Sequence, residues 1–165
     1  MYGNPATRAL IHGLKYQNIR SALPSIEKML KAYLDKTLAL IPKEEYAIVP
    51  VPLHKRKEMM RGFNQAELIA KILEKYLLAH DYPVTYADFL KRGKSTKPQA
   101  ELETFKEREI NLAEAFFVEN LEKIKNRRII LVDDVFTSGA TMREAVRVLR
   151  RAGAKQIIGF VVALA

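Results

Sequence analysis

Two adjacent aspartates, Asp133 and Asp134, directly follow the aliphatic run "IILV". Such a run is typical of a buried β-strand, so we expect both carboxylates at the edge of a sheet. An ionised carboxylate only accepts hydrogen bonds, and two together suit a pair of hydroxyl donors, such as a sugar diol, or a cation. Two like charges side by side therefore indicate a binding site.

The residues after the aspartates suit an anion. They are small or hydroxylated and lead into a helical pattern: Thr137, Ser138, Gly139, Ala140 and Thr141. The first backbone N–H groups of a helix have no partner within it and the helix dipole is positive there, so a phosphate binds well. Gly139 lets the backbone come close because it carries no Cβ. Carboxylates for a diol and a cradle for a monophosphate, a few residues apart, match a ribose 5-phosphate bound end to end.

Two other interpretations of these residues are weaker. Walker B strands of P-loop enzymes also end in acidic residues, but those enzymes need a G-x-x-x-x-G-K-[ST] loop. None of the seven glycines of this chain stands in such a loop. An ordinary capped turn explains Thr141 at a helix start, but it does not explain two neighbouring carboxylates, whose repulsion costs free energy.

The elements that position these residues alternate along the chain. Apolar residues recur at helical spacing in four segments, residues 5–14, 23–41, 66–77 and 142–149. Runs rich in β-branched and aromatic residues predict strands over residues 46–53, 84–90, 114–119, 127–133 and 156–165. This alternation indicates an α/β fold, with a mostly parallel central sheet flanked by helices on both faces. Ligands of such folds bind outside the carboxyl ends of the strands, where we expect the two aspartates.

Length and composition limit the class of protein. The 165 residues suit a single domain, with a helical segment over residues 1–42 and the core over residues 43–165. The chain has no cysteine, which excludes disulfides and thiolate zinc sites, and its three histidines are scattered. No apolar run reaches the roughly 18 to 20 residues of a membrane span, and the first residues lack the features of a signal peptide. We therefore expect a cytoplasmic protein.

The formal net charge of +9 predicts a polyanionic partner, either nucleic acid or a phosphorylated small molecule. Lysine and arginine concentrate in residues 54–62, 91–97 and 123–128. Solvated loops are a second explanation of such runs, and we favour it for the last of them.

The segment "ILVDDVFTSGAT" resembles the phosphoribosyl pyrophosphate signature of type I phosphoribosyltransferases. The resemblance implies the type I fold and a role for each residue. Asp133 and Asp134 would hold the ribose 2- and 3-hydroxyls and act in catalysis, and residues 137–141 would hold the 5-phosphate.

Similarity to one family covers nearly the whole chain. Three more segments are similar to the ComF family, phosphoribosyltransferase-like proteins linked with competence and DNA uptake: "VPVPLHKRKEMMRGFNQAELIA" (49–70), "STKPQAELETFKEREINLAEAFFV" (95–118) and "LIHGLKY" (10–16). Members commonly carry an upstream zinc ribbon with four cysteines, which this sequence lacks. Alanines also flank Glu114, where a glycine is expected before "AF".

The same resemblance assigns the other half of the site. The loop after "VPVPL" would bind pyrophosphate through Leu53, His54, Lys55 and Arg56. A flexible lid that excludes water would include Arg92, Lys94, Thr96 and Gln99. Mg²⁺ is expected to be bound through the diphosphate and not by a cage of protein side chains.

Several residues of these segments keep two interpretations. Arg61 and Gln65 are either neighbours of the pyrophosphate or surface residues, and we favour a structural role for Arg108 and Asn111 at the base of the lid. An N-terminal hood formed by residues 1–42, with Lys15 and Tyr16, would cover the acceptor. The sequence specifies neither the acceptor nor a general base.

These expectations favour a glycosyltransferase that moves phosphoribose from 5-phosphoribosyl 1-diphosphate to an acceptor. The alternative is a non-catalytic competence module that senses this ligand or associates with single-stranded DNA or a competence helicase. A fold shared with enzymes does not decide between them. A homodimer is compatible with both.

Overall fold

The computed structural model describes residues 19–93 and 115–164. The helices are α2 (Ile19–Thr37), α3 (Lys55–Arg61), α4 (Gln65–Leu78) and α6 (Ala140–Arg151). The strands are β1 (Tyr46–Pro50), β2 (Val84–Tyr86), β3 (Leu90–Arg92), β4 (Phe116–Val118), β5 (Arg128–Phe136) and β6 (Gln156–Leu164). Two short 3₁₀ turns are η1 (Leu38–Leu40) and η3 (Leu121–Lys123). In this part of the chain, no helix has both the length and the apolar character needed to cross a membrane.

Four of the strands form a parallel sheet in the order β2-β1-β5-β6. Parallel neighbours need crossover connections, and helices supply them, α4 between β1 and β2 and α6 between β5 and β6. The remaining two strands, β3 and β4, form a separate antiparallel pair in which Leu90 lies opposite Val118. The predicted α/β class with a mostly parallel sheet is confirmed.

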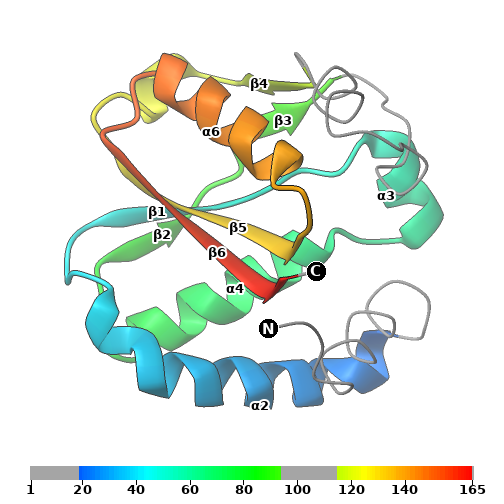
Figure 1. Ribbon diagram of the computed structural model, residues 1–165, viewed down its shortest axis with the longest axis vertical. Coiled ribbons are helices and arrows are strands. Elements are labelled where there is room, and N and C mark those ends of the chain that lie inside the picture. The colour runs from blue at the N-terminus through cyan, green and yellow to red at the C-terminus, as the bar shows by residue number, and fades with distance from the viewer. Residues whose placement is uncertain (1–18, 94–114, 165) are drawn as a thin grey trace.

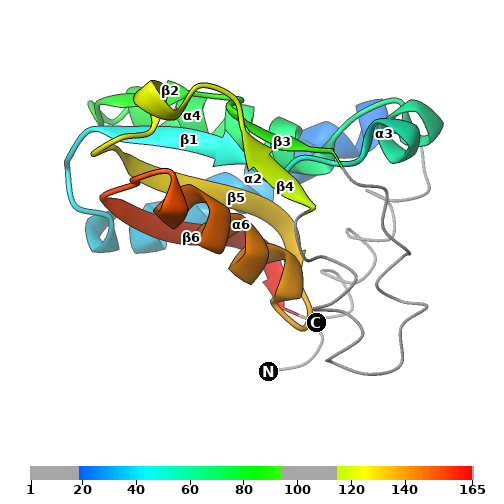
Figure 2. The same cartoon turned by 90° about the horizontal axis from the view of Figure 1, so that it is seen from above.

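Both faces of the sheet are covered (Figures 1 and 2). Helices α2 and α4 lie on one face, whereas α6 and the β3–β4 pair lie on the other. Side chains alternate between the faces along each strand. On β1, for example, Ile48 packs under α2 and α4, and Val49 packs toward α6 and the β3–β4 pair.

Helix α2 belongs to the core. Its Leu30 and Leu34 are buried and pack with Ile48 and Val132 of the sheet. The described part of the predicted segment 1–42 therefore covers a face of the sheet. Residues 1–18, including Lys15 and Tyr16, lie outside the described residues, so the hood remains a prediction.

Three predicted strand boundaries are wrong. The strand predicted over residues 46–53 ends at Pro50, since the two prolines cannot donate to a neighbouring strand. β5 does not end at Asp133 but continues through Phe136, because Val135 and Phe136 are apolar and pair with Ala163 and Leu164 of β6. The single strand predicted over residues 84–90 is two strands, with the exposed Asp88 lying between them.

Helix α3 was not predicted. Lys55 and Arg56, expected in a loop, form its first turn, and its end is set by Gly62, whose φ of 78° suits glycine. Three of the four predicted lid residues and the two residues assigned to the lid base lie outside the described residues: Lys94, Thr96, Gln99, Arg108 and Asn111.

Candidate functional site

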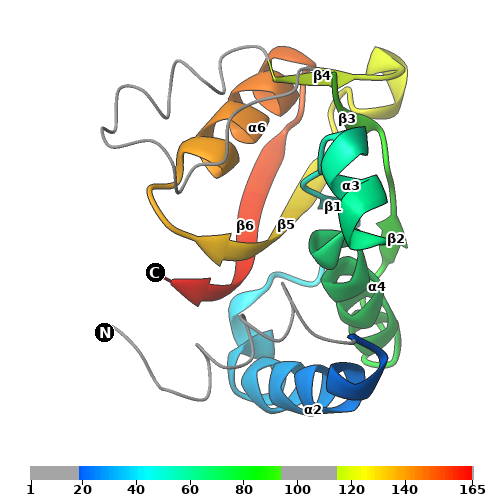
Figure 3. The same ribbon diagram turned by 90° about the vertical axis from the view of Figure 1, so that its right-hand side faces the viewer.

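Two loops meet at the carboxyl edge of the sheet, after the neighbouring strands β1 and β5. The two strands are paired up to Pro50 and Val132, and the Val51 N–H donates to the Val132 carbonyl at 2.8 Å. Figure 3 views the molecule toward this edge, with α3 and the turn from β5 into α6 in front. Because the strands are adjacent, residues more than 70 positions apart in sequence share one site.

Asp133 and Asp134 point to opposite faces of the sheet. Leu131 packs toward α6 and Val132 toward α4, so the alternation along β5 places Asp133 on the α6 side and Asp134 on the α4 side. Both residues are partly buried, and the Asp133 carboxylate accepts the backbone N–H of Asp134 at 2.9 Å. No ion pair holds either aspartate within residues 19–93 and 115–164.

The Asp133 carboxylate is held in an environment that disfavours its charge. Burial raises the pKa of Asp133 to about 8, and the neighbouring charge of Asp134 adds to the shift. The Arg92 guanidinium acts in the opposite direction, but its effect is smaller. A diol or a cation bound here would relieve this repulsion, because either one stabilises the ionised form.

The raised pKa predicts a stability gain when the charge is removed. When an acid has a higher pKa in the folded than in the unfolded chain, the fold loses stability as pH rises from the ordinary pKa of the acid to its raised pKa. We therefore expect Asp133→Asn to melt above the wild type at about pH 9, with the difference shrinking toward about pH 4. Each tenfold difference between the acid dissociation constants of Asp133 in the folded and unfolded chain corresponds to about 1.4 kcal/mol in the free energy of unfolding. Thermal melts across this range check the expectation, and a variant less stable than wild type at about pH 9 would contradict it.

The predicted anion cradle lies at the turn from β5 into α6. Gly139 precedes the helix with a φ of 72°, and the first turn of α6 contains no acidic residue. The Ala140 N–H donates to the Ser138 hydroxyl at 3.4 Å, and Arg143 Nη1 donates to the Ser138 carbonyl at 3.0 Å. The ring of Phe136 lies against Gly139, where it occupies the space that a Cβ would need.

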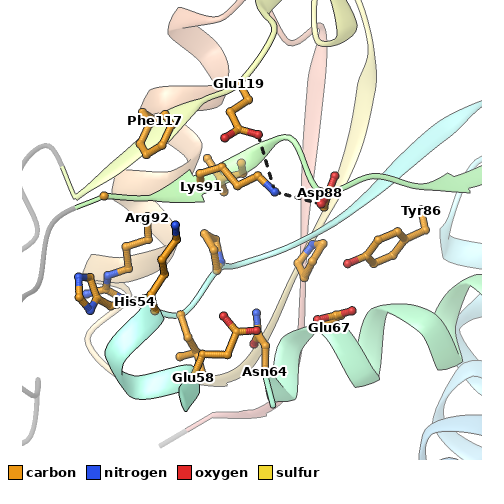
Figure 4. Close-up of a pocket in the computed structure, with 16 residues that line it drawn as sticks. His54, Glu58, Asn64, Glu67, Tyr86, Asp88, Lys91, Arg92, Phe117 and Glu119 are labelled. Carbon is orange, nitrogen blue, oxygen red and sulfur yellow. Dashed lines mark hydrogen bonds and ion pairs between the residues drawn. The ribbon is translucent and has the colours of Figure 1, made fainter. Parts of the chain in front are cut away.

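A cavity of about 520 Å³ lies beside the first turn of α3 (Figure 4). Its walls come from the loop after β1, helices α3 and α4, and the β3–β4 pair with its flanking residues. It is lined by Pro50, Pro52, Leu53, His54, Lys55, Glu58, Asn64, Glu67, Tyr86, Asp88, Leu90, Lys91, Arg92, Gly93, Phe117 and Glu119. Arg92 is the one predicted lid residue that the structure describes. It lines the same cavity as three of the four predicted pyrophosphate residues, Leu53, His54 and Lys55.

The two ends of this cavity differ in charge. In Figure 4, His54 and Arg92 lie at one end, and Tyr86 and Glu67 lie at the other. At the second end, burial and the nearby carboxylates, led by Glu67, raise the pKa of Tyr86 to about 12. An anion would be repelled there, so the end near His54 and Arg92 is the one suited to a diphosphate.

Arg92 lies between the two halves of the site. It lines the cavity, its guanidinium lies 5.3 Å from the centre of the Phe116 ring, and Asp133 is near enough to influence its titration. Burial lowers the pKa of the Arg92 guanidinium, and the Asp133 carboxylate opposes that shift. Neighbouring Lys91 is instead bound to carboxylates, 3.0 Å from Asp88 and 3.9 Å from Glu119.

Two residues hold the loop after β1 in place. His54 caps α3, because its Nδ1 accepts the Arg56 N–H at 3.3 Å. The buried Asn64 caps α4 by accepting the Ala66 N–H at 3.0 Å, and its amide nitrogen donates to the Val51 carbonyl at 3.1 Å. The Asn64 contact to Val51 was not predicted from the sequence.

We expect Asn64→Ala to destabilise the fold by about 1 to 3 kcal/mol, because it removes a helix cap and leaves a buried carbonyl without its donor. Urea unfolding measures the loss. Asn64→Asp is the comparison variant, since it keeps the capping oxygen but replaces the donor to Val51 with a charged acceptor, so it should lose stability mainly through that contact. An alanine variant as stable as the wild type would rule out this role.

Comparison with known proteins identifies the family. A model described as "Phosphoribosyl transferase domain" matches residues 16–165. The chain belongs to this phosphoribosyltransferase family. The predicted type I phosphoribosyltransferase fold is thereby confirmed.

Individual relatives are competence and DNA-utilization proteins. The phosphoribosyltransferase chain is 40% identical over 115 residues to competence protein F of Haemophilus influenzae, covering 67% of this chain and 47% of that protein. It is 33% identical to competence protein ComFC of Bacillus subtilis, covering 68% of this chain and 41% of that protein. It is 31% identical to the DNA utilization protein YhgH of Escherichia coli K12, covering 93% of this chain and 65% of that protein. The resemblance to the ComF family is confirmed. The chain spans about two fifths to two thirds of the length of these relatives.

The phosphoribosyltransferase fold brings most of the predicted site residues to one edge, in two groups. Asp133 and Asp134 lie with residues 137–141, and Leu53, His54 and Lys55 lie with Arg92 around the cavity. Arg56 is exposed in the first turn of α3. The two residues left open, Arg61 and Gln65, hydrogen-bond each other at 3.3 Å.

Proposed function

We propose that this phosphoribosyltransferase domain binds 5-phosphoribosyl 1-diphosphate with Mg²⁺ and transfers the phosphoribosyl group to an acceptor. The supporting observation is the meeting of two loops at the carboxyl ends of the paired strands β1 and β5. One loop carries a carboxylate pair and a helix N-terminus, and the other borders a cavity that Arg92 also lines. This order suits a ligand with a phosphate at one end and a diphosphate at the other.

Each group would take one part of the donor. Asp133 and Asp134 would accept hydrogen bonds from the ribose hydroxyls, and residues 137–141 would bind the 5-phosphate. Leu53, His54, Lys55 and Arg56 would contact the diphosphate through backbone N–H groups and side chains. Arg92 lies where it would bridge the ribose and diphosphate ends.

Transfer breaks the anomeric C–O bond, so positive charge develops on the sugar and negative charge on the leaving diphosphate. Positioning and charge stabilisation then provide most of the catalysis. Asp133 and Asp134 lie on the sugar side, whereas Lys55, Arg56 and Arg92 lie on the diphosphate side. The predicted lid residues Lys94, Thr96 and Gln99 would help to exclude water, which competes with the acceptor.

The residues present fit a Mg²⁺ ion carried by the ligand. Within the described residues, no group of three or more histidine or acidic side chains could hold a metal by itself. The pair Asp133 and Asp134 nevertheless has a repulsion that a nearby cation would relieve. When bound, Mg²⁺ would neutralise charge on the leaving diphosphate.

Pyrophosphate release tests the transfer. The protein is incubated with Mg²⁺, 5-phosphoribosyl 1-diphosphate and a panel of purine and pyrimidine bases. Acceptor-dependent release supports an enzyme. If the protein binds the donor but releases no pyrophosphate with any base, the proposal of catalysis on nucleobases fails.

A second candidate is a non-catalytic accessory module that associates with single-stranded DNA or a competence helicase. The names of the relatives and the net charge of +9 favour it. Exposed Arg150 and Arg151 lie in the last turn of α6, and exposed Lys155 follows the helix in the chain. Retention on single-stranded DNA should then persist in moderate salt, whereas general charge attraction is lost steeply as salt rises.

A further inference from the structure

The two edge strands of the central sheet, β2 and β6, differ in how they are protected (Figure 2). Strand β2 is only three residues long, and the Glu74 carboxylate accepts its Tyr86 N–H at 2.7 Å. Strand β6 is nine residues long and contains neither a charged residue nor a proline. Within residues 19–93 and 115–164, no strand pairs with its outer side. Natural proteins normally shorten, charge or cover an edge strand, because its unpaired backbone groups pair readily with another chain.

The side chains of β6 are also less buried than those of its neighbour β5. Parallel strands are normally buried on both faces. Residues 129–132 of β5 are all buried, whereas Ala163 is the one buried residue of β6. On the α2 side, the ring of Phe160 lies 6.4 Å from the ring of Tyr33, which is itself 54% exposed. An accessible apolar surface therefore continues from β6 onto α2.

Gly159 lies near the middle of β6 and is exposed. Neither its backbone nor its packing requires a glycine. Its φ is not positive, and a Cβ there would meet only Met142, at an ordinary contact distance of 3.8 Å. A glycine inside a strand often marks a place where another backbone approaches closely. The centre of β6 therefore leaves room for a neighbouring chain.

A basic groove of about 470 Å³ lies beside this edge on the α6 face of the sheet. It is lined by residues of α6: Met142, Arg143, Val146, Arg147, Arg150 and Arg151. Met142 connects the groove to β6, since it also lies beside Gly159. Arg150 and Arg151 are exposed, and in the described part of the chain neither forms an ion pair. A chain bound along β6 would therefore meet positive charge on this face.

We propose that the outer edge of β6 binds an extended acidic segment of another protein, which adds a strand to the sheet. Backbone hydrogen bonds would supply the pairing, as they do when other peptides join a sheet edge. Side chains alternate along such a strand. Acidic residues at every second position would face the arginines of α6, and apolar residues between them would face Phe160 and Tyr33. This proposal does not depend on phosphoribosyl transfer.

A second copy of this chain fits the same edge less well. Antiparallel pairing of two β6 strands would join the two sheets and place the two α6 helices next to each other on one face. Helix α6 has four arginines and one glutamate, and like charges at close range repel each other. Charge complementarity therefore favours an acidic partner over self-association.

Fluorescence polarisation with labelled peptides tests the proposal. The probe has nine residues, the length of β6, with glutamate and valine alternating. One control peptide has lysine in place of glutamate, and a second keeps the glutamates but carries an N-methyl group on each amide. We expect saturable binding of the probe and no binding of the lysine peptide. The N-methylated peptide should bind at least about tenfold more weakly, because it cannot donate backbone hydrogen bonds.

Arg150→Glu combined with Arg151→Glu is the matching change in the protein. We expect the probe to bind this variant about tenfold more weakly, since two attractive charges become repulsive. Lys28→Glu combined with Lys75→Glu is the control. It changes the charge equally at exposed positions of α2 and α4, on the opposite face of the sheet, and should bind the probe like the wild type.

The proposal is overturned if either control peptide binds as tightly as the probe, or if the arginine variant binds the probe like the wild type. A wild type that sediments as a dimer and takes up no probe would assign the edge to a second copy of the chain. Displacement of the probe by oligothymidylate at a lower concentration than by unlabelled probe would assign the arginines to nucleic acid. Melting temperatures of both variants verify that each is folded.

Discussion

Asp133→Asn combined with Asp134→Asn is expected to weaken binding of 5-phosphoribosyl 1-diphosphate by at least about 100-fold. Hydrogen bonds to charged groups contribute about 1.5 to 3 kcal/mol each, and the double variant removes the charge from two acceptors at once. A ligand at about 100 times its Kd stabilises a folded protein by about 2.7 kcal/mol. For a chain of this size, that corresponds to a rise in Tm of about 5 to 10 °C. The wild type should show this rise with Mg²⁺ and ligand, and the double variant should show none.

We do not expect the Asp133 substitution in that variant to cause unfolding. The raised pKa of Asp133 means that its charge costs stability in the absence of ligand, so its removal should keep or raise the Tm at neutral pH and above. Such a trade between stability and function is common at binding sites. A variant with Asp81→Asn and Glu122→Gln removes the same number of charges at exposed positions. If this control also loses the ligand-induced rise, net charge and not the aspartate pair would explain the effect.

Gly139→Ala is expected to produce the second large effect. The new Cβ would stand 2.4 Å from Phe136 Cζ, closer than unbonded atoms approach, and the φ of 72° disfavours any residue with a Cβ. Strain of this kind costs about 1 to 3 kcal/mol before the clash is counted. We therefore expect a loss of about 2 to 4 kcal/mol in the free energy of unfolding, together with loss of ribose 5-phosphate binding.

Gly62→Ala separates the two causes. Gly62 has nearly the same backbone angle, with a φ of 78°, but nothing lies within 4 Å of its would-be Cβ. The control should show the backbone strain alone, about 1 to 3 kcal/mol, and should leave ribose 5-phosphate binding unchanged. Equal destabilisation of the two variants, measured by urea unfolding, would mean that Phe136 does not constrain the cradle.

The sequence predicted the part of the site that lies on one continuous segment. Asp133, the cradle and α6 follow one another in the chain, and their order along a strand, a turn and a helix determines where they meet. The C-terminal end of β5 was less predictable, because Val135 and Phe136 extend this strand only by pairing with β6. The opposite orientation of Asp133 and Asp134 follows from that extension.

Individual side-chain contacts between distant segments were not predictable. The acidic end of the cavity joins Glu67 of α4 with Tyr86 of β2, and no local pattern signals that these side chains meet. The same holds for Arg92, whose nearness to Asp133 depends on how the β3–β4 pair packs against the sheet. Helix α3 was missed because two prolines and a basic run resemble a loop, and its cap, His54, is an uncommon capping residue.

The most direct test is calorimetric titration of 5-phosphoribosyl 1-diphosphate with Mg²⁺ into the wild-type chain and into the double asparagine variant. A carboxylate pair and a phosphate cradle at one sheet edge predict saturable binding at one site per chain in the wild type and loss of that signal in the variant. Equal heats from the two proteins, or a wild type that takes up no ligand, would contradict the proposed donor site.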